Sequence, residues 1–548
     1  MTTRPDSRNV RAGDPAQDSP QKIAKPAARS NGNSHSSLHP AGNKITSEFL
    51  SDRSSQRRAA PMQIRQTAGR PLRVMKFGGT SIGDASCVSK VIDIIESASL
   101  YSDPVVVVSA MAGVTDRLID AALQSEAGNH SAAAAILAEL QKKHDLEAEK
   151  LLTSSSGLDY LRQKTDAILK EGNELCRRAS LAPTLTLQTR DAITSYGERL
   201  SAALLATALR ERGTLSEAIE ATEVLVTNSC FGNAEPLMNI TRERCEARIR
   251  PALEKGIIPV ITGFIGATAD GELTTLGRGG SDFSATILGA ALHADEVTIW
   301  TDVNGVLTSD PRLVPGACTV PEISYHEAEE LARFGAKVLH PKTLRPLMHT
   351  NIPLWIRNTF APEKPGTKVT AEGSSNDVGV KALAVFNDAA LIKLGGRAIA
   401  AFPNVFSRTF KAIAAVQADL LLVLHSSSQN DVRFVVPSAR AADMIEILRC
   451  EFSRNLSDEM SEHIALDATV GVMSVVGQNM RHVAAIVEST FTALKSENVN
   501  IIAIAQGFSD CNVSFIVEQK DLQTALISTH RELRLGATDS EELTTESL

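Results

Sequence analysis

The pattern of apolar positions divides the chain into four parts. Residues 1–70 lack apolar periodicity and are rich in Ser, Arg, Pro, Asn and Gln. Such a segment cannot bury enough surface to offset its ordering entropy, so a disordered extension is predicted. From 71 to 370, short apolar strands alternate with amphipathic helices. Shorter strand and helix patterns follow over 380–535, and 536–548 is predicted to be a flexible tail.

The alternation over 71–370 predicts a parallel-rich α/β sheet covered by helices. Strands are expected at Leu72–Phe77, Val105–Val108, Ile257–Ile261 and Val297–Trp300. Helices are expected at Val88–Glu96, Leu118–Leu123, Ala132–Leu152, Glu198–Arg212 and Ser281–Leu292. The strands are almost wholly apolar, which is typical of strands that are buried on both faces.

An internal repeat occupies the C-terminal part of the chain. Residues 390–436 align without a gap with 471–517, so that Phe410 matches Phe491 and Phe434 matches Phe515. Each copy is predicted to form a strand, a glycine turn, a helix, a strand, a turn and a strand. We expect two modules, 380–460 and 461–535. They are either purely structural copies or a regulatory pair, and attachment to an enzyme favours regulation.

Composition excludes several classes of function. The net charge of −8 and an aromatic content of 4% do not fit a nucleic-acid-binding protein. No apolar run reaches the roughly 18–20 residues that a membrane-spanning helix needs. The seven cysteines are scattered without a C-x-x-C pair, so neither a disulfide framework nor a zinc site is expected.

These features predict a cytoplasmic protein with reduced thiols. The Ser/Arg bias of the first 70 residues also permits a plastid transit peptide, although their acidic residues argue against one. A third interpretation is a dispensable tail ahead of Met62, from a start codon placed too early.

The first chemical motif is Lys76-Phe77-Gly78-Gly79-Thr80-Ser81, which ends an apolar strand. The glycines allow backbone to approach a phosphate closely, and the following N–H groups can donate to it. Lysine supplies a charge for a transferring phosphoryl group. The lysine precedes the glycines, so this is not a Walker A loop. An ordinary tight turn remains the alternative.

Two further motifs point to the same chemistry. Arg278 and Asp282 lie in a glycine-rich segment just before a predicted helix, where an anion can bind. Thr301 and Asp302 follow a strand, at the edge of an α/β sheet where ligands bind. A plain helix cap for Asp282 and a plain Asx turn at Asp302 remain the alternatives.

Four segments together resemble the aspartokinases of the amino-acid kinase superfamily. They are K-F-G-G-T-S at 76–81, T-L-G-R-G-G-S-D at 275–282, W-T-D-V-N-G-V-L-T-S-D-P-R at 300–312 and F-G-A-K-V-L-H-P at 334–341, the last expected to be helical. The resemblance runs from about residue 72 to about 530. It implies a helix-sandwiched kinase sheet followed by two ferredoxin-like ACT modules.

The resemblance also implies roles for individual residues. Catalysis would involve Lys76, Arg278 and Asp282, and aspartate would contact Thr115, Glu198, Arg278 and Asp282. The nucleotide would contact Lys76, Gly78, Gly79, Thr80, Ser81, Thr301, Asp302, Leu307, Arg312 and Lys337. Leu307 stands where relatives often carry a tyrosine near the adenine. ATP is the implied co-substrate and Mg²⁺ would accompany it, and no residue is predicted to be a resident metal ligand.

The repeated modules resemble the ACT domains of aspartokinases, and Val475–Met480 is most like the aspartokinase part of bifunctional aspartokinase–homoserine dehydrogenases. The family implies feedback inhibition by threonine or lysine. Effector contacts are expected at Asn500, Ile501 and Gln506. In the first copy His425 replaces the equivalent glutamine, so it is either an altered effector contact or a plain strand-end histidine.

The implied activity is phosphorylation of L-aspartate on its side chain, the first step toward lysine, threonine, methionine and isoleucine. A homodimer or higher oligomer through the ACT modules is expected. The chain ends about 30 residues after the aligned repeat, which stops at 517, and this favours an enzyme without a reductase domain. Two alternatives are a related kinase acting on glutamate, acetylglutamate or UMP, and a non-enzymatic amino-acid sensor.

Overall fold

The computed structural model describes residues 69–336, 339–374, 379–395, 404–415, 420–426, 431–453, 464–478, 480, 484–506 and 510–536. The predicted N-terminal extension and C-terminal tail lie outside this range, apart from Gly69, Arg70 and Gly536. In the described part of the chain, no helix is long and apolar enough to cross a membrane.

The region predicted to be catalytic is built on an eight-stranded sheet with the order β3-β5-β2-β1-β8-β10-β11-β9. Its strands are β1 (Leu72–Phe77), β2 (Asp103–Val108), β3 (Ser216–Ile219), β5 (Ile258–Thr262), β8 (Glu296–Thr301), β9 (Glu322–Ser324), β10 (Leu354–Asn358) and β11 (Thr367–Thr370). All neighbours are parallel except β10 and β11. The carboxyl ends of β1, β2, β5 and β8 therefore meet at one edge, where the predicted motifs follow.

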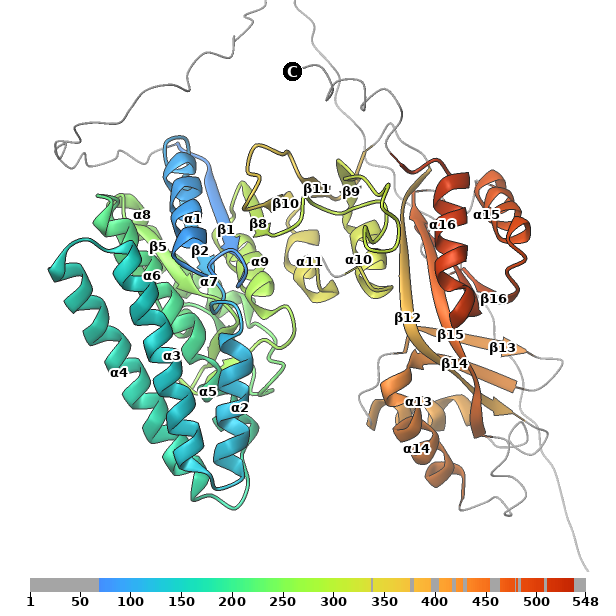
Figure 1. The fold of residues 1–548 in the computed structure, drawn as a ribbon, viewed down its shortest axis with the longest axis horizontal. Coiled ribbons are helices and arrows are strands. Elements are labelled where there is room, and N and C mark those ends of the chain that lie inside the picture. The colour runs from blue at the N-terminus through green and yellow to red at the C-terminus, as the bar shows by residue number, and fades with distance from the viewer. Residues whose placement is uncertain are drawn as a thin grey trace, which may run out of the picture. The chain divides into compact units, whose positions relative to one another are not determined.

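Helices cover both faces of this sheet, as the ribbon shows (Figure 1). One face packs against α1 (Ala85–Ala98), α2 (Val114–Glu126), α3 (His130–Leu151), α4 (Ser155–Ser180) and α6 (Tyr196–Glu211), with α5 (Leu187–Thr194) beside them. The other face packs against α7 (Met238–Arg248), α8 (Arg250–Glu254), α9 (Gly280–Leu292), α10 (Tyr325–Arg333) and α11 (Pro341–Met348). A small sheet of β4 (Val226–Thr227), β6 (Ile265–Thr268) and β7 (Leu273–Thr275) adjoins the larger one. The sandwiched α/β sheet predicted from the sequence is confirmed.

Alternation along β1 decides where its residues point. Leu72 and Val74 pack with the α9 side of the sheet, whereas Met75 and Phe77 pack with α1. Because side chains alternate across a strand, Lys76 belongs to the α9 side, at the edge where β1 ends.

The repeated modules, whose predicted role is regulatory, form a six-stranded sheet with the order β13-β14-β12-β15-β17-β16, called here the regulatory region. It comprises β12 (Val380–Gly395), β13 (Leu422–Ser426), β14 (Asp431–Pro437), β15 (Ile464–Gly477), β16 (Ile501–Ala505) and β17 (Asn512–Glu518). Helices α13 (Val405–Ala415) and α14 (Ala441–Ser453) lie together, as do α15 (Ala484–Ser496) and α16 (Leu522–Glu532) (Figure 1).

The two modules of this region share their central strands. The second half of β12 pairs with β14, from Ala389–Pro437 to Gly395–Asp431. Along its whole length β12 also pairs antiparallel with β15, whose C-terminal half continues to β17. Each ferredoxin-like sheet therefore takes one half of β12 and one half of β15, so the modules are interlocked rather than strung one after the other.

Two local predictions differ from the structure. The segment Phe334–Pro341 was expected to be a helix, and this is wrong: α10 ends at Arg333 and α11 begins at Pro341. Gly335 has φ +104°, and a Cβ there would lie 2.4 Å from the carbonyl oxygen of Val385. The close approach of β12 thus requires a glycine turn here. Helix α4 was not predicted, because its buried stripe includes Thr165 and Gly172, which weaken the apolar signal.

Candidate active site

Lys76 and Asp282 form an ion pair at the carboxyl edge of the sheet. Lys76 is 8% exposed at the end of β1, and Asp282 lies in the first turn of α9. The residue that caps α9 is Gly279, with φ +71°, and no side chain caps the helix. Asp282 is therefore not a simple helix cap, because its carboxylate faces the lysine.

The glycine loop after Lys76 is held against two strands. Gly78 donates its N–H to the carbonyl of Trp300 at 3.2 Å, which ties the loop to β8. A Cβ on Gly79 would lie 2.9 Å from the carbonyl oxygen of Ala110, so no larger residue fits without a backbone shift. Ser81 is buried, and its hydroxyl lies 2.8 Å from that of Thr359, just after β10. Thr80, in contrast, is exposed.

A cavity of about 400 Å³ opens beside this loop. It brings together six residues that the sequence assigned to catalysis, aspartate binding or nucleotide binding. They are Lys76, Gly79, Thr115, Glu198, Arg278 and Asp282. They come from β1, the loop after it, α2, α6 and the start of α9, so segments 200 residues apart in sequence converge on one space.

Glu198 is the most unusual group in the cavity. It is 3% exposed, so it is not a solvated helix charge. One carboxyl oxygen accepts the N–H of Ala110 at 3.1 Å, and the other is buried without a hydrogen-bond partner. Burial raises the pKa of Glu198 to about 8, while the Ala110 N–H and the charge of Lys76 act in the opposite direction. An unpaired buried acceptor in a cavity suits a ligand cation such as an ammonium group.

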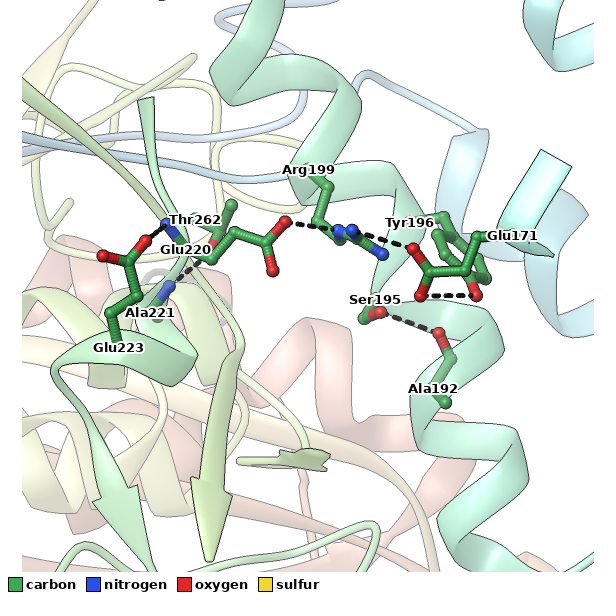
Figure 2. Close-up of polar contacts among 9 residues, drawn as sticks. All are labelled: Glu171, Ala192, Ser195, Tyr196, Arg199, Glu220, Ala221, Glu223 and Thr262. Carbon is green, nitrogen blue, oxygen red and sulfur yellow. Dashed lines mark hydrogen bonds and ion pairs between the residues drawn. The ribbon is translucent and has the colours of Figure 1, made fainter. Parts of the chain in front are cut away.

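The helix that carries Glu198 is anchored by its next residue, Arg199. Figure 2 shows this guanidinium between two carboxylates: Glu220 at 2.8 Å and Glu171 on α4 at 3.1 Å. The phenol of Tyr196 also reaches Glu171, at 3.4 Å. These contacts join α4, α6 and the segment after β3. Sequence reasoning missed them, because the partners are dispersed along the chain.

Asp191 is a second residue that the sequence did not reveal. It is buried at the centre of α5 and accepts the N–H groups of Gly232, at 2.7 Å, and Thr275, at 2.9 Å. The Thr275 hydroxyl donates to it at 2.8 Å. Burial raises the pKa of Asp191, and these three donors act against that shift. Thr275 lies only three residues before Arg278 in the sequence. By binding Thr275, Asp191 therefore fixes the base of the loop that presents this arginine.

Three of the residues predicted to contact the nucleotide line a second cavity of about 520 Å³. It contains Asp302, Leu307 and Arg312. Arg312 is exposed and binds Asp310 through two nitrogens, at 2.9 and 2.5 Å. The hydroxyl of Thr301 donates to Asp302 at 3.2 Å, so Thr301 supports this segment without lining the cavity. Lys337 lies outside the described residues.

One wall of the second cavity comes from the regulatory region. Leu383, Ala384 and Val385 of β12 line it. The N–H of Leu383 donates to the carbonyl of Thr308 at 2.8 Å. A strand shared by both regulatory modules is therefore hydrogen-bonded to the segment that carries Leu307 and Arg312.

The predicted effector residues lie at opposite edges of the regulatory sheet. His425 is on edge strand β13, exposed and in edge contact with Phe406 at 5.6 Å. Asn500, Ile501 and Gln506 lie at or beside the other edge strand, β16. A single chain does not bring the two sets together.

Comparison with known proteins identifies the family. Residues 71–358 match the amino acid kinase family, and 473–533 match an ACT domain. The chain is 30% identical over 464 residues to lysine-sensitive aspartokinase 3 of Escherichia coli, covering 84% of this chain and 98% of that protein. The chain belongs to the aspartokinases.

Other aspartokinases agree with this assignment. The bifunctional aspartokinase/homoserine dehydrogenase of Daucus carota is 33% identical over 474 residues, which cover 85% of this chain and 51% of that protein. The chain thus spans about half the length of its plant relatives. The crystal structure of E. coli aspartokinase III with aspartate and ADP, in the R-state, superposes with a TM-score of 0.70 at 29% identity, covering 84% of this chain and all of that one. The resemblance inferred from the motifs is confirmed.

The buried Glu198 predicts a pH-dependent stability in this aspartokinase. Its folded-state pKa of about 8 exceeds the value of 4.5 for a free glutamate. The folded state therefore retains a proton that the unfolded chain loses above pH 4.5. The stabilisation is fully present below pH 4.5 and disappears as the pH rises through 8. Relative to Glu198→Gln, the wild type should lose up to about 1.4 kcal/mol per pH unit in this window.

Melting temperatures of both proteins between pH 5 and 8.5 would measure this effect. Glu211→Gln is the matched control, because hydrogen bonds from Ser154 and Thr153 lower the pKa of Glu211 to about 2. Glu211 stays ionised in both states over this range, so its difference from wild type should be constant. An equally constant difference for Glu198→Gln would contradict the assignment of a protonated, buried Glu198.

Proposed function

We propose that this chain is an aspartate kinase, which converts ATP and L-aspartate to 4-phospho-L-aspartate and ADP. One observation carries the proposal: a single cavity combines the Lys76–Asp282 pair with an unpaired buried Glu198 and an exposed Arg278. This set offers a group of the right charge for each part of an amino-acid substrate and for a phosphoryl group.

The substrate's charged groups find complementary partners in the cavity. Arg278 suits a carboxylate, because a guanidinium can donate two parallel hydrogen bonds. Glu198 suits the ammonium group, whose charge would favour the ionised form of this high-pKa carboxyl. Thr115 is half-buried at the start of α2 and offers a hydroxyl to the same ligand. Together these contacts would leave the aspartate side chain facing Lys76.

The chemistry needs little beyond positioning. A side-chain carboxylate oxygen attacks the γ-phosphorus, the bond to the β,γ-bridging oxygen breaks, and ADP leaves with that electron pair. The carboxylate is already ionised, so no general base is required. Lys76 would stabilise charge on the transferring phosphoryl group, and Asp282 holds its ammonium in place. Mg²⁺ would enter with ATP and neutralise charge on its phosphate oxygens.

The nucleotide would extend from this loop toward the second cavity. Asp302, Leu307 and Arg312 line that cavity, and the aspartokinase III structure was solved with ADP. Leu307 can pack against a base through apolar contact alone. Since β12 forms one wall, a shift of the regulatory sheet would alter this cavity directly. That contact supports feedback control by an amino acid bound to the ACT modules.

The edges of the regulatory sheet bear on the oligomeric state of the protein. Both β13 and β16 are edge strands, and exposed edges are templates for pairing with a second chain. A homodimer or larger oligomer through the ACT modules would complete the effector sites that one chain leaves apart.

The plant relatives are named as chloroplastic and another relative is bacterial, so a cytoplasmic enzyme and a plastid enzyme are both compatible with these names.

The substrate can be tested by coupled ADP release. With L-aspartate the enzyme should release ADP, because Glu198 and Arg278 match the ammonium and carboxylate groups of an α-amino acid. Glutamate, N-acetylglutamate, UMP and a reaction without acceptor serve as comparisons. Preferred turnover of glutamate or UMP would assign another kinase of the same superfamily. ADP release that no acceptor stimulates would support a sensor without kinase activity.

Lys76→Ala should reduce kcat about 100- to 1,000-fold, the usual effect of losing a group that stabilises transition-state charge. The melting temperature should change little by comparison, because the Asp282 carboxylate left without its lysine lies at the edge of an open cavity, where water can solvate it. Lys170→Ala, at an exposed position of α4, is the matched control and should keep full turnover. Normal turnover by Lys76→Ala would remove this lysine from the mechanism.

Feedback control predicts a falling initial rate as lysine or threonine is titrated. Gln506→Ala should raise the inhibitor concentration needed for half inhibition about tenfold or more if Gln506 hydrogen-bonds the effector. His425→Ala separates the two interpretations of that residue: a matching change marks an effector contact, and an unchanged curve marks a plain strand-end histidine. Insensitivity of the wild type to both amino acids would refute regulation by either one.

A further inference from the structure

A third cavity, of about 510 Å³, lies on the α1 side of the main sheet. Residues of β1, β8 and β10 form the floor of this cavity. Helix α1 forms one side, and the segment after β10 forms the other. None of the residues implicated in catalysis, nucleotide binding or effector binding lines it. Its volume is within the range of small-molecule sites.

The cavity contains two buried donors without partners. Trp300 is 5% exposed, and its indole N–H has no hydrogen-bond partner. The Nε of Arg357 is also buried without one. Buried donors normally have partners, and leaving one unpaired costs about 1–3 kcal/mol. Two such donors at one cavity indicate that a hydrogen-bond acceptor belongs there.

The charges around the cavity favour an anion. Of its two carboxylates, Glu296 pairs with Arg73 at 3.1 Å, and Asp93 pairs with Arg212 outside the lining. The remaining cations have no carboxylate partner among the described residues. Lys90 lies over the ring of Phe360 at 5.1 Å, and Arg357 lies over the ring of Trp355 at 4.6 Å. Burial lowers the pKa of Arg357, and the charge of nearby Glu296 acts in the opposite direction.

Most of the remaining lining is apolar or aromatic, and Ser97, Thr298 and Thr359 add hydroxyl groups. Met75, Ile94 and Trp300 form an apolar wall, and Phe360 and Tyr101 are exposed at the rim, at 39% and 73%. A small inorganic ion would leave these surfaces in contact with water. A flat or apolar body attached to the anionic group would cover them.

We propose that this cavity binds a small organic anion: its carboxylate or phosphate contacts Arg357, Lys90 and the indole N–H of Trp300, and its apolar body packs against Met75 and Phe360. The site is separate from the proposed substrate, nucleotide and effector sites. It stands whether or not the chain phosphorylates aspartate, since it rests on the geometry of the sheet face alone.

The site also touches the phosphate loop. Thr359 lines the cavity, its hydroxyl lies 2.8 Å from that of Ser81, and its N–H donates to the carbonyl of Thr301 at 2.8 Å. An occupant that moved this segment would act on both the glycine loop and the end of β8.

The chain supplies its own probe for this site. It contains two tryptophans, Trp300 in the lining and Trp355 beneath Arg357. Intrinsic fluorescence excited at the tryptophan band therefore reports on this cavity. Benzoate and phenyl phosphate should change the emission saturably, and neutral benzamide should bind about tenfold more weakly or worse, since it lacks a charge-assisted hydrogen bond.

Arg357→Met should weaken benzoate binding about tenfold or more, because it removes the charge and keeps much of the side-chain length. Lys368→Met is the matched control: Lys368 also lies over the Trp355 ring, at 5.9 Å, but does not line the cavity, so benzoate affinity should be unchanged. Lys90→Gln, on the exposed side of α1, should weaken binding several-fold without touching the core.

Three results would overturn the proposal. They are the absence of a saturable change with either anion, equal affinity for benzoate and benzamide, and benzoate affinity that survives in both Arg357→Met and Lys90→Gln. If the anions do not bind and Arg357→Met instead shifts the sedimentation coefficient, the face belongs to a contact between chains. The full chain is used throughout, and melting curves confirm that each variant is folded.

Discussion

The ion pair between Lys76 and Asp282 is the contact around which the proposed active site is arranged. It joins the end of β1 to the first turn of α9, so the sheet and the helix that covers it meet at a pair of opposite charges. Removing two charges from water is costly, and such pairs persist where geometry and function require them. Asp282 holds the ammonium in place while one side remains open to the cavity. The glycines on either side let both backbones approach this point.

The other charges of the site differ in how far they are compensated. Glu198 is buried with one oxygen unpaired, whereas Arg278 is exposed between Gly277 and Gly279, both of which have positive φ. The first is a rigid acceptor fixed by α6 and its Arg199 anchor. The second is a donor on a loop whose base is fixed by Asp191. A substrate would thus meet a rigid acceptor at one end and a donor on a loop at the other. This arrangement is consistent with a site that selects its ligand by length as well as by charge.

Much of this arrangement could be predicted from the sequence. The apolar strands, the motif order and the repeat identified the sandwiched sheet and the paired modules, because periodicity and glycine chemistry are local properties. Six predicted residues do meet in one cavity. The sequence could not reveal Asp191 or the Arg199 network, since their roles depend on partners from distant segments. The prediction of a helix at 334–341 was wrong, because the need for a turn at Gly335 arises from the close approach of β12, which the sequence alone does not show.

The interlocked regulatory strands affect how this protein is made. The first half-sheet needs the N-terminal half of β15, and the second half-sheet needs its C-terminal half together with β17 and β16, so neither is complete until β15 has left the ribosome. In the first module β12, β14 and β13 can pair with one another at once, but the second edge of β12 must wait for β15, about 70 residues downstream. A stop codon ahead of β15 would thus also remove one of the two neighbours of β12 in the first module. The two modules therefore complete their sheet together, rather than one after the other in the order in which they are synthesised.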